Sequence, residues 1–328
     1  MKRRIAALTL VMAMLLSGCC YAPGNERASF IEKWLELPKL QISGYQSSKT
    51  QSTDDPVDST APESGDSIAI EAPVVNLDEM PKREPGDFVR VRDYIPDLVT
   101  DLRYATSNNF TGGVVYDFTD VYLRYSTVLK LMKVQDELRQ QGLMLKVWDG
   151  FRPLEAQWKL WNAKPDPVYV SHPVNGTNSH ARGNTIDVTL VNAQGKEVEM
   201  PTGFDDFTSF ADRDYSDCTD AAAANATLLQ EIMEKYGFTG LQTEWWHFSD
   251  EDDYAVEKIF DPGAISLWRA ECNEYINLRV SPDVSAAVLA TIPDNDQFTV
   301  LGWTGNFAFI EYKDVRGYVN AGYISRVE

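Results

Sequence analysis

Apolar and polar positions in the central part of the chain follow periods that predict short strands and amphipathic helices. Residues 88–94 alternate with the two-residue period of a strand. Apolar side chains over 128–138 recur at every third or fourth position, the period of a helix, and Gly142 follows as a natural C-cap. A β-prone run comes next, over 143–148, and then a second predicted helix over 153–161 whose first residue is a proline, which suits a first helical turn.

Another long helix and a last strand complete this part of the chain. The helix is predicted over 221–236, with Thr219 or Asp220 as its N-cap and Gly237 as the residue that closes it. The strand is predicted over 241–248. Because helices and strands are mixed without a regular strand–helix–strand rhythm, the pattern favours the α+β class.

The C-terminal part differs, since it contains short β-prone runs separated by turns. Phe260-Asp261-Pro262-Gly263 is the expected boundary. The predicted strands are 287–291, 297–301, 307–312 and 317–319. We therefore expect a mixed domain over 86–263 and a small all-β barrel over 264–328.

The N-terminus has the features of an export signal. A charged start, Lys2-Arg3-Arg4, precedes an apolar run over 5–16 that is too short to span a membrane comfortably but suits a signal peptide. The run ends in Leu16-Ser17-Gly18-Cys19, which resembles the lipobox of bacterial lipoproteins. Residues 1–19 are then the signal peptide, and Cys19 carries the lipid that anchors the protein to the outside of the cell membrane. Plain secretion and a cytoplasmic protein with an apolar start are the alternatives.

Residues 20–85 differ in composition from both of the expected domains. Ser, Thr, Asp, Glu and Pro dominate from Lys39 onwards. Such a segment buries too little apolar surface to offset the entropy of ordering it. We expect a flexible stalk between the lipid anchor and the folded domains.

Composition and charge narrow the choice of partners. The 328 residues carry a formal net charge of −19, which argues against nucleic acid as a partner because nucleic acid attracts basic surfaces. Hydrophobic residues make up 44% of the chain, enough for the cores of the two domains that its length suggests.

The residues suited to catalysis gather in two short motifs. His180 is followed seven residues later by Asp187, and His247 stands three residues after Glu244. Two imidazoles and one carboxylate are a typical ligand set of a catalytic zinc, and they leave the fourth tetrahedral position open for water. We therefore interpret His180, Asp187 and His247 as the ligands of one Zn²⁺ per chain, with Glu244 as the base beside it.

Neither spacing fits a regular element. The interval between His180 and Asp187 matches neither one face of a helix nor one face of a strand, so it requires a turn, and Arg182-Gly183-Asn184 supplies one. Glu244 and His247 would face opposite sides of an ideal strand. We expect a bend or bulge between them.

These residue types together indicate metal-assisted hydrolysis of a peptide bond. Zinc lowers the pKa of its bound water towards about 7. Glu244 is expected to take the proton of that water and to pass it to the leaving amine. Arg152, which follows a predicted strand, is the candidate guanidinium that stabilises the oxyanion together with the metal.

Structural interpretations of the same residues stay open. A single histidine is more often packed in a core or exposed on a surface, and Asp187 on its own is consistent with a turn cap. His172 is expected to be a loop residue, and Trp245-Trp246 to pack in the core. Cys218 and Cys272 are candidates for a disulfide in an exported protein, and the sequence leaves this pairing open.

Three motifs together resemble the zinc D-alanyl-D-alanine dipeptidases of vancomycin-resistance type. The motifs are Asp149-Gly150-Phe151-Arg152-Pro153, Ser179-His180-x-Arg182-Gly183-x-x-Ile186-Asp187 and Glu244-Trp245-Trp246-His247, within a similarity over residues 87–261 that includes Tyr104-Ala105-Thr106. The resemblance implies a compact α+β fold and zinc on His180, Asp187 and His247. It also implies Glu244 as general base and Arg152 as the transition-state arginine, with hydrolysis of D-Ala-D-Ala in a small closed pocket.

Some features depart from this family. The resistance enzymes act in the cytoplasm, whereas this chain carries an export signal. The segment between Arg152 and His180 is shorter than in the resistance enzymes, which would open the pocket to longer peptides. Asn178 stands where a serine that helps to bind substrate is expected.

The C-terminal part resembles bacterial SH3 domains. The match rests on Asn277-Leu278-Arg279-Val280-Ser281-Pro282 and on Gly317-Tyr318-Val319-Asn320 with Tyr323-Ile324. Such modules commonly bind cell-wall peptides, which implies a tether that raises the local concentration of substrate. A domain that only packs on the catalytic domain is the alternative.

The leading hypothesis is an exported, lipid-anchored zinc dipeptidase that acts on D-Ala-D-Ala or related peptidoglycan peptides. A D,D-carboxypeptidase or endopeptidase on longer stem peptides is the second hypothesis. A non-catalytic cell-wall-binding protein is the third. Each expects the cell wall, and not nucleic acid, as the partner.

Overall fold

The computed structural model describes residues 69–327. The expected signal peptide, the lipid-attachment residue Cys19 and most of the expected stalk lie outside these residues. Among the helices over 69–327, none has the length and apolar character needed to cross a membrane.

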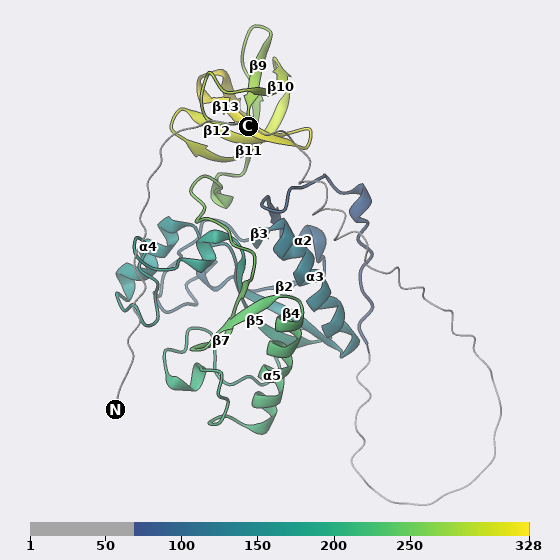
Figure 1. Ribbon diagram of the computed structural model, residues 1–328, viewed down its shortest axis with the longest axis vertical. Coiled ribbons are helices and arrows are strands. Elements are labelled where there is room, and N and C mark those ends of the chain that lie inside the picture. Colours follow the sequence, from purple (N-terminus) through teal and green to yellow (C-terminus); the bar gives the residue numbers. More distant parts are fainter. Residues whose placement is uncertain (1–68, 328) are drawn as a thin grey trace, which may run out of the picture. The chain divides into compact units, whose positions relative to one another are not determined.

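A five-stranded sheet lies at the centre of the mixed domain (Figure 1). Strands β2 and β4 run parallel, and the other neighbouring pairs are antiparallel. Strand β4 confirms the prediction for 143–148. The strands in order across the sheet are β2 (Val99–Thr100), β4 (Leu143–Asp149), β5 (Thr185–Asn192), β7 (Glu244–Asp250) and β6 (Phe238–Leu241).

Two long helices, α3 (Tyr125–Gln140) and α5 (Asp220–Lys235), pack on this sheet and confirm the predicted helices. Thr219 is the N-cap of α5, since its hydroxyl accepts a hydrogen bond from the first helical turn. Gly142 and Gly237 follow the helices with φ of 71° and 88°, as expected for residues that end them. One shared core includes Leu131, Leu138, Leu145, Ile186, Val188, Leu229, Trp245 and Trp246.

Two predicted strands differ from the structure. Residues 88–94 form β1 (Phe88–Arg90), which pairs with β3 (Tyr122–Arg124), followed by a helical turn, α2 (Val91–Tyr94). Both end residues of α2 are buried, and a three-residue spacing brings both to one side in a helix but not in a strand. The strand predicted over 241–248 is a hairpin of β6 and β7, because the exposed pair Gln242-Thr243 reverses the chain.

The C-terminal domain is one seven-stranded sheet with the order β10-β9-β13-β12-β11-β8-β14 and a core of its own. All four predicted runs overlap strands. Sequence reasoning missed three strands: β8, β9 and β14. Each has only three to five residues, too few for a clear alternation of apolar and polar side chains, and on β8 the apolar Leu267 is 44% exposed. The strands are β8 (Ser266–Ala270), β9 (Tyr275–Arg279), β10 (Val288–Pro293), β11 (Gln297–Thr304), β12 (Phe307–Tyr312), β13 (Val315–Asn320) and β14 (Ile324–Arg326).

The two cysteines of the described residues are free thiols. Cys218 lies just before α5, and Cys272 lies between β8 and β9. The disulfide that the sequence left open between them is therefore not formed.

Candidate active site

Two neighbouring strands and one turn bring the three expected metal ligands together. Asp187 on β5 and His247 on β7 are register partners, so their side chains lie side by side. His180 lies in the 3-10 turn η3 (Ser179–Arg182), and Gly183 follows it with φ of 80°. This confirms the turn predicted between His180 and Asp187. A glycine is needed there, because a Cβ at residue 183 would overlap a buried aromatic ring.

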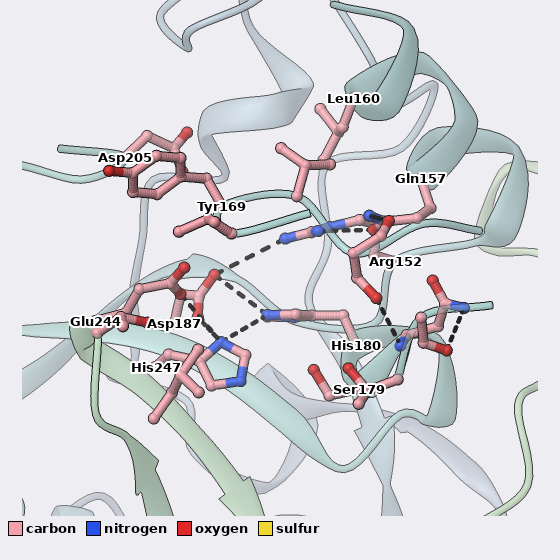
Figure 2. A pocket seen from close by; sticks show the side chains of 18 of the residues that line it. Arg152, Gln157, Leu160, Tyr169, Ser179, His180, Asp187, Asp205, Glu244 and His247 are labelled. Atoms are coloured by element: carbon pink, nitrogen blue, oxygen red, sulfur yellow. Dashed lines mark hydrogen bonds and ion pairs between the residues drawn. The ribbon is translucent and has the colours of Figure 1, made fainter. Parts of the chain in front are cut away.

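The donor atoms of these ligands converge on one point (Figure 2). Nε2 of His180 lies 3.2 Å from Nδ1 of His247 and 3.3 Å from Oδ2 of Asp187. Nδ1 of His247 lies 3.0 Å from Oδ1 of Asp187. Burial alone would raise the pKa of Asp187, but the two imidazoles hold that pKa below its usual range, so a carboxylate faces both rings. The arrangement is that of a metal-binding group.

The surroundings of the cluster fit a bound metal cation. Nδ1 of His180 lies 2.8 Å from the carbonyl oxygen of Gly150. A proton on Nδ1 donates to this carbonyl and leaves the lone pair of Nε2 directed at the cluster. Oδ1 of Asp187 is buried and accepts no hydrogen bond of regular geometry from any residue of 69–327, although Nδ1 of His247 lies 3.0 Å away. A buried carboxylate oxygen in this state is costly unless a cation binds it.

Glu244 lies beside the cluster because strand β7 is irregular. Gly240 on β6 pairs with Phe248, whereas Leu241 pairs with Glu244, so residues 245–247 have no partner on β6. This confirms the bulge predicted between Glu244 and His247. The bulge places a carboxylate oxygen of Glu244 3.6 Å from Nδ1 of His247. Burial raises the pKa of Glu244 to about 7, a value that suits a proton acceptor near neutral pH.

Arg152 faces the cluster from the segment between β4 and α4 (Leu154–Ala163), a predicted helix (Figure 2). Its Nε and Nη2 donate to Oδ2 of Asp149 at 2.9 and 2.6 Å, and its Nη1 donates to the amide oxygen of Gln157 at 2.8 Å. Nη2 also lies 3.9 Å from Oδ2 of Asp187. Burial alone would lower the pKa of Arg152, but the Asp149 carboxylate keeps it well above its usual value. The guanidinium is therefore a fixed cation.

Asp205 is a pocket residue that sequence reasoning missed. It lies in the loop between β5 and α5 with φ of 56°, and the hydroxyl of Tyr104 donates to its two carboxylate oxygens at 3.1 and 3.0 Å. Burial raises the pKa of Asp205 to about 7. No spacing connects Asp205 with the metal ligands. The one hint in the sequence is its partner Tyr104, which belongs to the motif Tyr104-Ala105-Thr106 of the family resemblance, but that motif had been given no function.

Asn178 holds the loop that precedes His180. It has φ of 47°, and its side-chain nitrogen donates to three carbonyls of the loop 172–176 at 3.1–3.3 Å. Asn178 therefore shapes this loop where a serine was expected to contact substrate. His172 lies in the loop, as predicted, and its ring packs 4.6 Å from that of Trp161.

The ligands, Glu244, Arg152 and Asp205 line one pocket of about 700 Å³ (Figure 2). The loop 167–178 and the hairpin of β6 and β7 supply much of the remaining wall. Pockets of about 300–1,000 Å³ hold drug-sized ligands. The pocket is therefore larger than a dipeptide requires, in contrast to the small pocket that the resemblance implied.

Comparison with known proteins places both domains in families. Residues 84–263 match the model of the peptidase family M15, described as D-Ala-D-Ala dipeptidase, and residues 274–325 match the bacterial SH3 domain. The first match covers more than half of the chain. Members of this peptidase family are metal-dependent, in agreement with the cluster of His180, Asp187 and His247.

Curated relatives carry the same family name. The chain is 38% identical to the D-alanyl-D-alanine dipeptidase of Escherichia coli K12 over 153 residues, which are 47% of this chain and 79% of the relative. It is 29% identical to that of Streptomyces coelicolor over 200 residues, which are 54% of this chain and 97% of the relative. It is 30% identical to that of Enterococcus faecium over 181 residues, which are 49% of this chain and 90% of the relative. The chain therefore belongs to the D-Ala-D-Ala dipeptidase family of M15 hydrolases, with a bacterial SH3 domain after its peptidase domain.

Proposed function

We propose that the protein is an exported zinc dipeptidase that hydrolyses D-Ala-D-Ala or closely related cell-wall peptides. The observation that carries the proposal is the convergence of His180, Asp187 and His247 beside a carboxylate, Glu244, and a fixed guanidinium, Arg152, in one pocket. The name shared by the relatives supports D-Ala-D-Ala as the substrate.

The proposed roles follow from the chemistry of each side chain. His180, Asp187 and His247 would hold the zinc ion, which when bound activates water and polarises the scissile carbonyl. Glu244 accepts the proton of the attacking water and returns it to the amine that leaves. A pKa of about 7 lets this carboxylate accept and release a proton at neutral pH.

Arg152 stabilises the charge that develops on the carbonyl oxygen. Asp149 and Gln157 already hold its guanidinium in place, so little reorganisation is needed when the oxyanion forms. Asp149 is itself fixed by the hydroxyl of Tyr116, which donates to it at 2.6 Å. Asp149 is therefore a positioning residue for Arg152.

Asp205 supports a substrate with a free amino terminus. Its carboxylate lines the same pocket as Glu244 and Arg152, and burial makes its negative charge unfavourable until a cation arrives. A free dipeptide carries its ammonium group on the residue that supplies the scissile carbonyl. In a longer peptide that nitrogen is acylated and uncharged, so Asp205 favours the dipeptide.

A D,D-carboxypeptidase or endopeptidase on longer stem peptides is the second candidate, favoured by the pocket volume of about 700 Å³. Incubation of the zinc-loaded protein with free D-Ala-D-Ala and with a stem pentapeptide separates the two activities. Efficient release of D-alanine from the dipeptide alone supports the dipeptidase. Comparable or faster cleavage of the pentapeptide supports the alternative.

The same assay tests whether the protein is a catalyst or a non-catalytic wall-binding protein. Glu244→Gln keeps the size of the side chain and removes the base, so we expect kcat to fall by about 10²–10⁴ with unchanged zinc content. Full turnover by this variant would show that Glu244 is not the base. A zinc-loaded wild-type protein that cleaves neither substrate would favour the non-catalytic role.

We also propose that a lipid on Cys19 anchors the protein and that the SH3 domain binds wall peptides. The lipobox-like motif supports the first point, and a groove of about 640 Å³ with the exposed side chains of Tyr275 and Tyr323 supports the second. Cys19→Ser should release the protein from the membrane fraction. Tyr275→Ala with Tyr323→Ala should reduce co-sedimentation with purified peptidoglycan without reducing turnover of free dipeptide.

A further inference from the structure

Arg213 bonds to both strands of the hairpin that carries Glu244. Its Nε donates to the carbonyl oxygen of Leu241 on β6 at 2.8 Å. Its Nη2 donates to the carbonyl oxygen of His247 on β7 at 2.9 Å. One guanidinium therefore bridges the two strands at the position of their bulge.

The bulge creates a need for such a bridge. Residues 245–247 have no partner on β6, so the regular ladder of that hairpin does not fix them. A buried carbonyl left without a donor costs about 1–3 kcal/mol. The planar fork of Arg213 offers two parallel N–H groups, which match two carbonyl acceptors in a way that an ammonium group does not.

The side chain of Arg213 is itself held in place. Its guanidinium carbon lies 4.4 Å from the ring centroid of Phe248, and Nη1 donates to the amide oxygen of Gln230 at 3.3 Å. The backbone nitrogen of Arg213 donates to the carbonyl of Gln242 at 3.0 Å. Gly240 lies so close that a Cβ there would overlap the guanidinium. Arg213 therefore has little freedom, and its position fixes that of the hairpin.

We propose that Arg213 is a positioning residue for the peptidase reaction, which holds the bulge in the shape that directs both Glu244 and His247 at one point. Arg213 is not among the described residues that line the pocket. Arg213 therefore acts through the two backbone carbonyls that it binds. This inference rests on the roles proposed above for Glu244 and His247.

Two variants test the inference by different routes. Arg213→Lys keeps the positive charge but replaces the planar fork by a single ammonium nitrogen, which cannot occupy the positions of both Nε and Nη2. Gly240→Ala keeps Arg213, but its new Cβ would lie 2.3 Å from the guanidinium carbon, so the guanidinium must move away from the two carbonyls. For both variants we expect kcat to fall about 10–100-fold with KM changed less than about threefold, and the affinity for Zn²⁺ to fall about tenfold. Zinc affinity is measured by competition with a chromophoric chelator, which requires no turnover.

Matched controls separate positioning from stability. Arg139 is also a buried arginine, and it binds both carboxylate oxygens of Asp97. It is not among the described residues that line the pocket. Arg139→Lys should lower the thermal midpoint and leave kcat per folded molecule and zinc affinity unchanged. Gly113→Ala, whose Cβ would meet its nearest neighbour at an ordinary 3.9 Å, is the control for Gly240→Ala.

Wild type and Glu244→Gln, run in the same assay, distinguish the possible failures. If wild type turns over, Glu244→Gln does not, and both Arg213→Lys and Gly240→Ala keep wild-type kcat and zinc affinity, the positioning role is wrong and the proposed function stands. Losses that only follow the folded fraction, as in Arg139→Lys, would overturn it as well. If Glu244→Gln keeps full turnover, the proposed role of Glu244 fails, and the inference fails with it.

Discussion

Replacing Asp205 by Asn tests which substrate the pocket is built for. Asn has nearly the same size and shape, and its amide oxygen still accepts a hydrogen bond from the hydroxyl of Tyr104. The change therefore removes a negative charge and little else. Since we propose that this charge pairs with the ammonium group of D-Ala-D-Ala, Asp205→Asn should weaken transition-state binding of the free dipeptide.

The expected size of the effect follows from the position of Asp205 on the pocket wall. Removing one partner of a buried, hydrogen-bonded charge pair costs about 2–5 kcal/mol. Asp205 is half-buried, so the lower end of this range applies. A loss of about 2 kcal/mol corresponds to a fall of about 30-fold in kcat/KM, because 1.36 kcal/mol is about tenfold.

The assay compares D-Ala-D-Ala with N-acetyl-D-Ala-D-Ala, which lacks the ammonium group. We expect Asp205→Asn to reduce kcat/KM about 30-fold for the first substrate and less than about threefold for the second. Asp206→Asn is the control, because the Asp206 carboxylate accepts hydrogen bonds from Thr208 in its own loop. Equal losses for both substrates, or no loss for the dipeptide, would refute the pairing of Asp205 with the substrate ammonium.

Four further changes probe the proposed metal site and the fold of the peptidase domain. A chelator should reduce turnover below about 1% of the untreated rate and lower the thermal midpoint, because zinc binds the native chain. Added Zn²⁺ should restore both. Turnover that survives metal removal would contradict the zinc site. Gly183→Ala should cost about 1–3 kcal/mol in denaturant unfolding and reduce zinc content, since its φ of 80° is strained for alanine and its Cβ overlaps Phe88. Gly195→Ala, with φ of 73° in open space, should cost about 1 kcal/mol and leave zinc content unchanged. Burial alone would raise the pKa of Glu257, but backbone amides and Arg124 hold it below its usual 4.5. The ionised Glu257 therefore stabilises the native state. Its contribution is complete above about pH 4.5 and is lost as the pH falls through the lower pKa of the native state. The thermal midpoint should thus fall less steeply between about pH 5 and 3 in Glu257→Gln than in wild type.

The convergence of His180, Asp187 and His247 and the bulge were predictable because their chemistry and spacing are visible in the sequence. The interval from His180 to Asp187 requires a turn, and the interval from Glu244 to His247 requires an irregular strand; both irregularities are present. Asp205 shows no such signal. Its hydrogen bond with Tyr104 joins residues 101 positions apart, so only the tertiary fold reveals it.

Helices and strands likewise divide into those that the sequence predicts and those that it does not. Helices α3 and α5 were predictable because each has a continuous apolar face and a glycine just after its end. The hairpin of β6 and β7 was not, because Gln242-Thr243 is a reversal without the glycine, asparagine or proline that usually marks a turn. The missed elements are thus those decided by packing around them and not by their own sequence.

The proposed metal ligands and the loop residues of the pocket lie on different parts of the fold. Asp187 and His247 lie on paired strands of the central sheet, so the strand ladder fixes their separation, and Arg152 follows a third strand of the same sheet. Asp205 and Asn178 lie in loops with φ of 56° and 47°, conformations that persist only when local contacts hold them. Loop positions of this kind change without disturbing the sheet. The loops around Asp205 and Asn178 can therefore alter the length of peptide that the pocket accepts while the sheet preserves the proposed metal site. This division agrees with a pocket that is larger than a dipeptide needs.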